Sequence, residues 1–139
     1  MSSGASRWIS PSTGFHTGVS VRNSLLGSGA ALVPLVAREA TRLTWYTCGP
    51  TVYDVAHVGH ARLFVSVDVL QRLLAARFGV ALDAVVNVTD VDEKLLRRAS
   101  ALGVDPRRLA RDMEASFLAD MRLLNVRAPT RLVRRRHRR

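Results

Sequence analysis

The sequence predicts an α/β fold built on parallel strands, and three consecutive segments support this prediction. Residues 43–49, LTWYTCG, are rich in β-branched and aromatic residues and lead into Pro50, which indicates a strand and then a turn. Over residues 59–78, apolar side chains recur every three or four positions, as on one face of a helix. Residues 81–90, ALDAVVNVTD, are typical of a buried strand. Strand, helix and strand in this order form a βαβ unit, which predicts a parallel sheet of Rossmann type.

The N-terminal region is predicted to contain a leader and two short strands. Residues 1–17 are rich in Ser, Thr and Gly and contain no acid, a composition typical of a mitochondrial transit peptide. An ordinary disordered N-terminus is the alternative. Alternating apolar and polar residues over 19–27 predict a strand and turn, and LVPLVA at 32–37 predicts a second, weaker strand.

The helix over 59–78 is expected to turn one apolar stripe to the core and to end at Gly79, a natural C-cap. The expected stripe consists of Leu63, Val67, Leu70 and Leu74, flanked by Phe64 and Phe78.

Two more helices are expected after the second strand. One covers residues 91–103 and ends at Gly103, and the next has Asp105 as its N-cap and Pro106 at its first position. The core stripe of this last helix is predicted to be Leu109, Met113, Phe117, Met121 and Leu124.

The formal net charge of +10 suggests a nucleic-acid partner, but the distribution of the charges weakens this interpretation. All eleven acidic residues lie within 39–126, whereas seven arginines lie in the last segment, 127–139. We therefore expect a nearly neutral folded region over 18–126 and a basic, disordered tail over 127–139. No apolar run is long enough to predict a membrane span, and the single cysteine excludes an internal disulfide.

His57 and His60 lie three residues apart, where the predicted strand gives way to the helix. The first N–H groups of a helix are unpaired and attract phosphate, and both imidazoles can donate hydrogen bonds to phosphate oxygens. Gly59 would allow a nucleotide to approach the backbone closely. This combination suits attack on the α-phosphate of ATP. A chance pair of exposed histidines, or a metal-binding pair, is the alternative.

Cys48 ends the first strand of the βαβ unit, and Thr89 follows its last strand closely, with Asn87 and Asp90 beside it. The carboxyl ends of parallel strands meet at one edge, so these side chains are expected to face one crevice. The Cys48 thiolate could bind zinc, which needs about four ligands, but the chain contains no second cysteine. A buried thiol that acts only as a small apolar group is the alternative.

Two stretches resemble a known family. YTCGPTVYDVAHVGHAR, residues 46–62, resembles the zinc-cysteine segment and HIGH motif of cysteinyl-tRNA synthetases, which are class I aminoacyl-tRNA synthetases. NVTDVDEKLLRRA, residues 87–99, resembles the next block of the same family. The resemblance covers roughly residues 17–130 and favours the mitochondrial form. It implies the first half of a class I (HUP-type) Rossmann catalytic domain over 18–126, in a truncated chain.

The resemblance implies a cysteine–tRNA ligase, in which ATP, with magnesium, activates cysteine as cysteinyl-adenylate before transfer to tRNA(Cys). His57, Gly59 and His60 would bind ATP, and the two histidines would be catalytic. Gly49 and Thr89 would bind cysteine, and Cys48 would be the first zinc ligand. The other zinc ligands and the KMSKS loop are missing from this chain, so we expect it to be inactive alone. The mitochondrial matrix is the expected location, with the cytoplasm as the alternative.

Two other functions fit the same residues. Another cysteine-activating ligase, which joins cysteine to an amino sugar, would share Cys48 and the HIGH-like residues. A non-enzymatic short form that binds RNA through its arginine tail belongs to a different class of protein.

Overall fold

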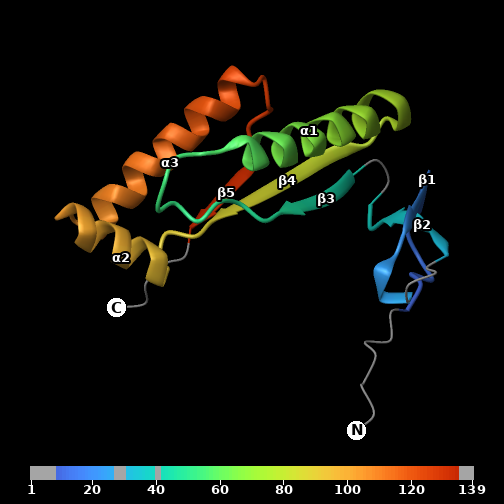
Figure 1. Cartoon of the computed structure of the whole chain (residues 1–139). Coiled ribbons are helices and arrows are strands. Elements are labelled where there is room, and N and C mark those ends of the chain that lie inside the picture. The colour runs from blue at the N-terminus through green and yellow to red at the C-terminus, as the bar shows by residue number, and fades with distance from the viewer. Residues whose placement is uncertain (1–8, 27–30, 40–41, 135–139) are drawn as a thin grey trace, which may run out of the picture. The chain divides into compact units, whose positions relative to one another are not determined.

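The computed structural model describes residues 9–26, 31–39 and 42–134 and divides the chain into two compact units (Figure 1). The first unit is built from the N-terminal residues up to 43 together with 74–82, and the second from 44–73 together with residues after 82. Residues 1–8 of the expected leader and residues 135–139 of the expected tail lie outside the described part.

The first unit contains an antiparallel pair of strands, β1 (Phe15–Arg22) and β2 (Leu32–Ala37), and a short 3-10 helix, η1 (Ser24–Leu26). The strand predicted over 32–37 is confirmed. The strand predicted over 19–27 instead begins at Phe15, so β1 overlaps the last residues of the expected leader, 15–17. The reason is pairing with β2, in which Phe15 stands opposite Ala37. The buried residues of this unit are Ala37, Leu43 and Val80, packed with Leu35 and Leu82.

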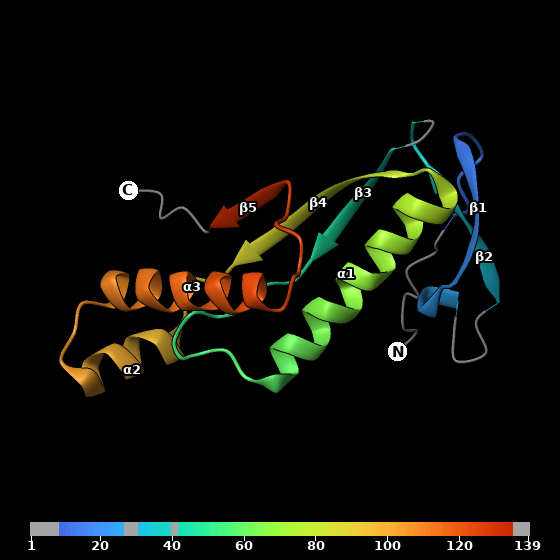
Figure 2. The same ribbon diagram turned by 90° about the horizontal axis from the view of Figure 1, so that it is seen from above.

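A three-stranded sheet forms the centre of the second unit, in the order β3 (Arg42–Thr47), β4 (Ala81–Val88) and β5 (Arg131–Arg134). The strands β4 and β5 run parallel, with Val85 opposite Arg131 and Val88 opposite Arg134. The arrow of β3 points the same way (Figure 2). The predicted parallel α/β fold is therefore confirmed.

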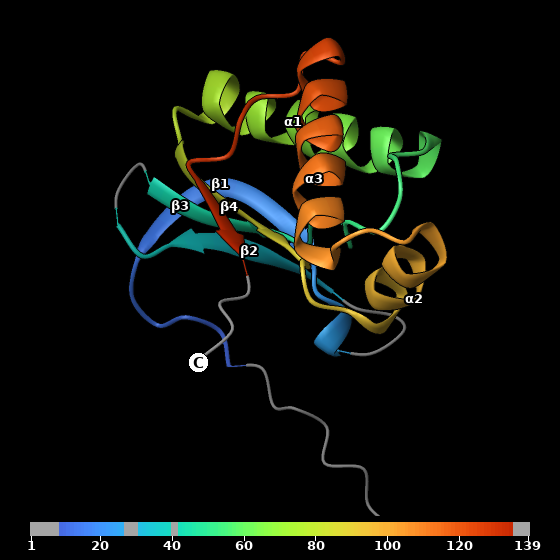
Figure 3. The same ribbon diagram turned by 90° about the vertical axis from the view of Figure 1, so that its left-hand side faces the viewer.

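Three helices follow the predicted order: α1 (Val58–Phe78), α2 (Glu93–Leu102) and α3 (Pro106–Leu123). In the second unit, α1 and α3 cover the same face of the sheet (Figure 1), and α2 lies beside the start of α3 (Figure 3). The predicted caps are confirmed, because Asp105 accepts a hydrogen bond from the N–H of Arg108 at 2.8 Å and Gly103 has a φ of 65°. No helix in the described ranges is long and apolar enough to cross a membrane.

The core of the second unit lies between these helices and the sheet. One buried cluster, Phe64, Val86, Phe117 and Met121, joins α1, β4 and α3. A second cluster joins α2 and the start of α3 to the end of β4, and consists of Val52, Val88, Leu95, Ala99, Leu109 and Ala110.

The predicted core stripe of α1 is partly wrong. Leu63 and Leu70 are 46% and 49% exposed, whereas Phe64, Asp68 and Gln71 are buried. The helix is therefore rotated so that Phe64 packs against β4 and α3, and buried Asp68 bonds to two half-exposed arginines, Arg72 and Arg127. Three further apolar residues were expected in or beside a core stripe but are not fully buried. Phe78 and Leu124 are exposed, and Met113 is half-buried.

The expectation of a disordered tail over 127–139 is wrong for residues 131–134, which form β5. Leu132 packs against both core clusters of the second unit. On either side of it, Arg131 pairs with buried Asp83 at 2.6 Å, and Arg134 pairs with buried Glu114. These arginines are held by acids that lie far away in the sequence, so local composition did not reveal the strand.

Candidate functional site

The predicted site lies where β3 turns into α1. An open pocket of about 510 Å³ is lined there by three of the predicted residues, Gly49, His57 and His60. Tyr53 and Lys94 also line it. The sequence predictions did not include these two side chains, although Lys94 is the one lysine in the sequence. The pocket therefore brings together residues that precede α1, a residue in the first turn of α1 and a residue of α2.

His57 and His60 form a stacked pair, with ring centroids 4.0 Å apart and planes inclined by 28°. The Nδ1 atom of His57 accepts a hydrogen bond from the N–H of Gly59 at 3.1 Å. The Nδ1 atom of His60 accepts from the N–H of His57 at 3.3 Å. A nitrogen that accepts carries no proton, so the proton of each neutral ring lies on Nε2. Both rings are therefore prepared to donate from Nε2.

The surroundings of His60 favour its uncharged form. Burial lowers the pKa of His60 below its usual 6.5, and the nearby charge of His57 lowers it further. The ring of His60 also lies edge-on to Phe117, at 6.2 Å between centroids. The uncharged form of His60, with its proton on Nε2, is therefore favoured near neutral pH.

Gly49 and Thr89 are linked through Asn87. The N–H of Gly49 donates to Oδ1 of Asn87 at 3.0 Å, and the hydroxyl of Tyr46 donates to the same oxygen at 2.7 Å. The amide nitrogen of Asn87 reaches Oγ1 of Thr89 at 3.5 Å. Gly49, Asn87 and Thr89 therefore lie together at the carboxyl edge of the sheet, with Tyr46 as an additional member, whereas Asp90, which was expected beside them, lines a different pocket.

The remaining predicted residues do not line the pocket. Gly59 lies at the start of α1, and an added Cβ there would lie 2.8 Å from the His57 ring. Thr89 is held by backbone hydrogen bonds to Pro50 and Val52, at 3.0 and 3.2 Å. The thiol of Cys48 is exposed. Gly59 and Thr89 thus contact lining residues of the pocket, His57 and Pro50, without lining it themselves.

Among the described residues, Cys48 alone cannot complete a zinc site. Within the described ranges, no three His, Cys, Asp or Glu side chains lie close enough together to hold a metal ion. Zinc sites in proteins need about four ligands, of which Cys48 could supply one. A zinc site at this position would depend on donors outside the described residues.

Comparison with known protein families finds one match that covers most of the chain. Residues 34–138 match the family described as "tRNA synthetases class I (C) catalytic domain". The match continues past Pro129, where the resemblance read from the sequence was expected to end.

Curated relatives agree over most of the chain. A cytoplasmic cysteine–tRNA ligase of Dictyostelium discoideum is 40% identical over 127 residues, which is 91% of this chain and 19% of the relative. A probable mitochondrial cysteine–tRNA ligase of Xenopus tropicalis is 45% identical over 123 residues, 88% of this chain and 21% of the relative. A Kocuria rhizophila ligase of L-cysteine and 1D-myo-inositol 2-amino-2-deoxy-alpha-D-glucopyranoside is 44% identical over 133 residues, 96% of this chain and 29% of the relative.

This chain therefore spans about a fifth of the length of the cysteine–tRNA ligases that it matches. The family match, the parallel fold and the histidine pair at the strand–helix turn lead to one assignment. The chain belongs to the cysteinyl-tRNA synthetase family, as part of a class I tRNA synthetase catalytic domain.

Proposed function

We propose that this chain carries the ATP-binding half of a cysteine–tRNA ligase, which activates cysteine and transfers it to tRNA(Cys). The observation that carries the proposal is the stacked pair of His57 and His60, with both Nε2 atoms available as donors beside a pocket at the start of α1. The N-terminus of this helix adds partial positive charge, which favours phosphate.

In the proposed reaction, a carboxylate oxygen of cysteine attacks the α-phosphorus of ATP. The bond from that phosphorus to the bridging oxygen breaks, and pyrophosphate leaves with the electron pair. Negative charge builds on the phosphate oxygens in the transition state. His57 and His60 would donate to those oxygens through Nε2, and donors of this kind stabilise a transition state by about 3 kcal/mol each. Magnesium would accompany the nucleotide.

Gly49 and Thr89 are the proposed contacts for the substrate cysteine. Both lie at the carboxyl edge of the sheet and are joined by Asn87, which supports a shared role. Cys48 is proposed as one zinc ligand, because a soft metal would discriminate the thiolate of cysteine from the hydroxyl of serine. The remaining ligands would come from residues that this chain does not contain.

ATP binding by the 139-residue chain tests the proposal. We expect saturable binding in equilibrium dialysis with labelled ATP, and a loss of about tenfold in affinity in His60→Asn, because a hydrogen bond to a charged oxygen is removed. His16→Asn, an exposed histidine on β1, is the matched control and should bind as the unmodified chain does. If the unmodified chain binds no ATP, the proposal is contradicted. It is also contradicted if His60→Asn binds ATP as tightly as the unmodified chain does.

Catalysis by this chain alone is not expected. The KMSKS loop and the other zinc ligands that the resemblance implies are not among these 139 residues. Cysteine-dependent exchange of pyrophosphate into ATP should therefore be undetectable with this chain. A measurable exchange rate would show that the residues of this chain suffice for cysteine activation.

The cellular location is proposed from the leader. Relatives of this chain include both cytoplasmic and mitochondrial cysteine–tRNA ligases. The acid-free, Ser-rich N-terminus favours mitochondrial import. Residues 1–40 fused to a fluorescent protein should direct it to mitochondria, and a diffuse cytosolic signal would favour the cytoplasmic alternative.

A ligase that joins cysteine to an amino sugar is the second candidate, because one such relative is 44% identical over 96% of this chain. Cysteine activation would be the same, and only the acceptor would differ. A full-length form supplied with tRNA or with amino-sugar acceptors would distinguish the two. The RNA-binding tail is a weaker candidate, since Arg131 and Arg134 are already paired with buried acids.

A further inference from the structure

A nucleotide in the pocket lined by His57 and His60 would need a fixed positive charge for its phosphates. ATP carries about four negative charges at neutral pH, whereas the environment of His60 favours its neutral form. Of the described residues that line this pocket, Lys94 is the one lysine or arginine. Any fixed cation for the phosphates of a nucleotide in this pocket would therefore come from Lys94.

Lys94 is positioned by α2 and by the ring of Tyr53. It is the second residue of α2, and its N–H donates to Oδ1 of the N-cap Asp92 at 2.8 Å. Its Nζ atom lies over the ring of Tyr53, 5.7 Å from the centroid. A cation over an aromatic face is held there without losing its charge. Lys94 therefore reaches the pocket from the start of α2, while His57 and His60 approach from the start of α1.

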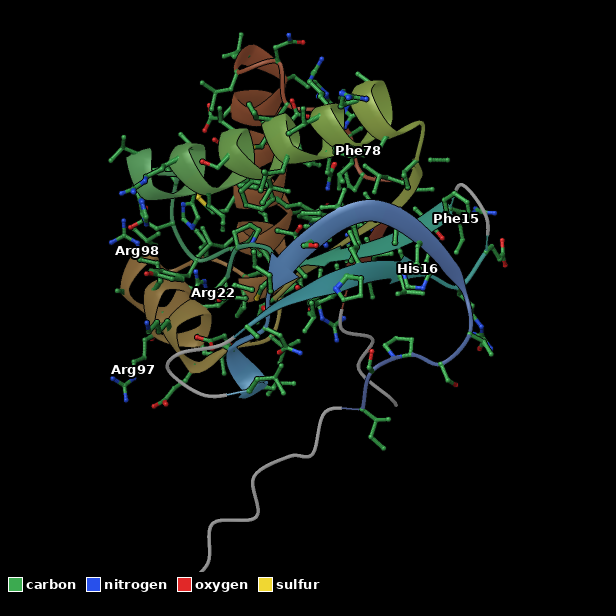
Figure 4. All side chains as sticks on the ribbon, turned by 90° about the vertical axis from the view of Figure 1, so that its right-hand side faces the viewer. Phe15, His16, Arg22, Phe78, Arg97 and Arg98 are labelled. Atoms are coloured by element: carbon green, nitrogen blue, oxygen red, sulfur yellow. The ribbon has the colours of Figure 1, made fainter. Side chains whose placement is uncertain are left out.

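The acids around Lys94 have other partners. Glu93 pairs with Arg97 at 2.5 Å, and Asp54, which also lines the pocket, pairs with Arg98 at 3.9 Å. The side chain of Arg97 extends outward from α2 (Figure 4). Within the described ranges no carboxylate forms an ion pair with Lys94, so none of these residues neutralises its ammonium group.

We propose that Lys94 binds the β- and γ-phosphates of ATP in this pocket, a role that rests on the proposed function. A lysine suits this task, because its ammonium group is a compact charge with three donors on a flexible stem. The same contact stabilises the pyrophosphate as it leaves, because the charge that develops on the bridging oxygen lies on the β-phosphate. Lys94 thus complements the histidines, which are assigned to the α-phosphate.

The proposal predicts a selective change in nucleotide affinity. In equilibrium dialysis with the 139-residue chain, Lys94→Met should weaken ATP binding about tenfold or more, the effect of losing one charge-assisted contact. Binding of AMP, which lacks the β- and γ-phosphates, should change by less than about twofold on the same grounds. Lys94→Arg keeps the charge and should restore most of the ATP affinity. Arg108→Gln removes one positive charge from an exposed position on α3 outside the pocket and should leave both affinities unchanged.

The outcomes distinguish a failure of the Lys94 role from a failure of the proposed function. If the unmodified chain binds ATP but Lys94→Met binds it equally well, the role of Lys94 is wrong and the proposed function stands. An equal loss of ATP and AMP affinity would also refute the phosphate role and would indicate a structural effect. If the unmodified chain binds no ATP, the proposed function itself fails. Far-UV circular dichroism of Lys94→Met should match the unmodified chain, because Lys94 is exposed and its backbone N–H still meets Asp92.

Discussion

The backbone of Gly49 lies directly against that of Asn87. The N–H of Gly49 donates to Oδ1 of Asn87 at 3.0 Å, and an added Cβ at Gly49 would lie 1.7 Å from the Asn87 carbonyl oxygen. No side chain fits this gap, because real Cβ contacts stay beyond about 3 Å. The glycine therefore lets the end of β3 approach β4 at the edge where the candidate site lies.

Gly49→Ala should force these two strand ends apart. We expect a loss of about 2 kcal/mol or more in the free energy of unfolding, measured by urea denaturation, because overpacking displaces backbone. Gly103→Ala is the matched control: its φ is 65° and nothing lies within 4 Å of the added Cβ, so only local strain of about 1 kcal/mol is expected. Equal losses in the two variants would contradict the close-approach interpretation.

Asp68 connects α1 to the segment that follows α3. It is 7% exposed and accepts hydrogen bonds from Nε of Arg72 at 2.5 Å and from Nε of Arg127 at 3.0 Å. Arg72 also donates to the carbonyl oxygen of Asn125 at 2.7 Å, where the chain turns with a φ of 57°. Burial alone would raise the pKa of Asp68, but the hydrogen bonds from Arg72 and Arg127 outweigh it and hold the pKa below 3.8.

Asp68→Asn should therefore destabilise the chain in a pH-dependent way. The unfolded carboxylate takes up its proton near pH 3.8, before the folded one does, so the contribution is complete above that pH and disappears as pH falls through the folded pKa. We expect a loss of about 1–2 kcal/mol at pH 6, kept small by the half-exposed arginines, and a narrowing difference below about pH 3.8. Asp112→Asn, an exposed acid on α3, should cost under about 0.5 kcal/mol. A difference that does not depend on pH would contradict this account.

The pKa of His60 should depend on its neighbour. In His57→Asn the charge of His57 is removed, so the pKa of His60 should rise toward 6.5 yet stay below it, because burial remains. Titration of the imidazole Hε1 resonances by NMR measures this value. Added salt should raise the pKa of His60 in the unmodified chain more than in His57→Asn, since only the charge effect is screened. A pKa that is unchanged or lower in the variant would be inconsistent with the stacked pair.

β5 should depend on the ion pair between Glu114 and Arg134. Nε of Arg134 donates to the two carboxylate oxygens of Glu114 at 2.9 and 3.1 Å, and Glu114 is buried. Glu114→Gln should cost about 1–2 kcal/mol, because the half-exposed arginine recovers some hydration. Hydrogen exchange of the amides of residues 131–134 should accelerate in this variant but not in Asp112→Asn. Unchanged exchange would mean that Leu132 alone holds the strand.

Local features of the sequence were sufficient for the order of the elements. A buried-strand composition predicted β4, and the three-to-four spacing predicted α1. Asp105, Pro106 and Gly103 predicted the ends of two helices. Each of these signals depends on residues within one helical turn or one strand, so it can be read without tertiary structure. The position of His57 and His60 at a strand–helix turn followed from the same local signals.

Local sequence patterns predicted the parallel α/β class, the caps and the histidine pair, whereas long-range packing sets which faces are buried and what surrounds the site. Spacing alone placed Leu63 and Leu70 in the core, but packing against β4 and α3 rotated α1 so that Phe64 and Asp68 are buried instead. An arginine-rich segment became β5 because buried acids some 20 and 48 positions away pair with Arg134 and Arg131. Lys94 entered the pocket in the same way, through contacts between elements that are distant in the chain. Such contacts leave no local periodicity, so only the folded chain reveals them.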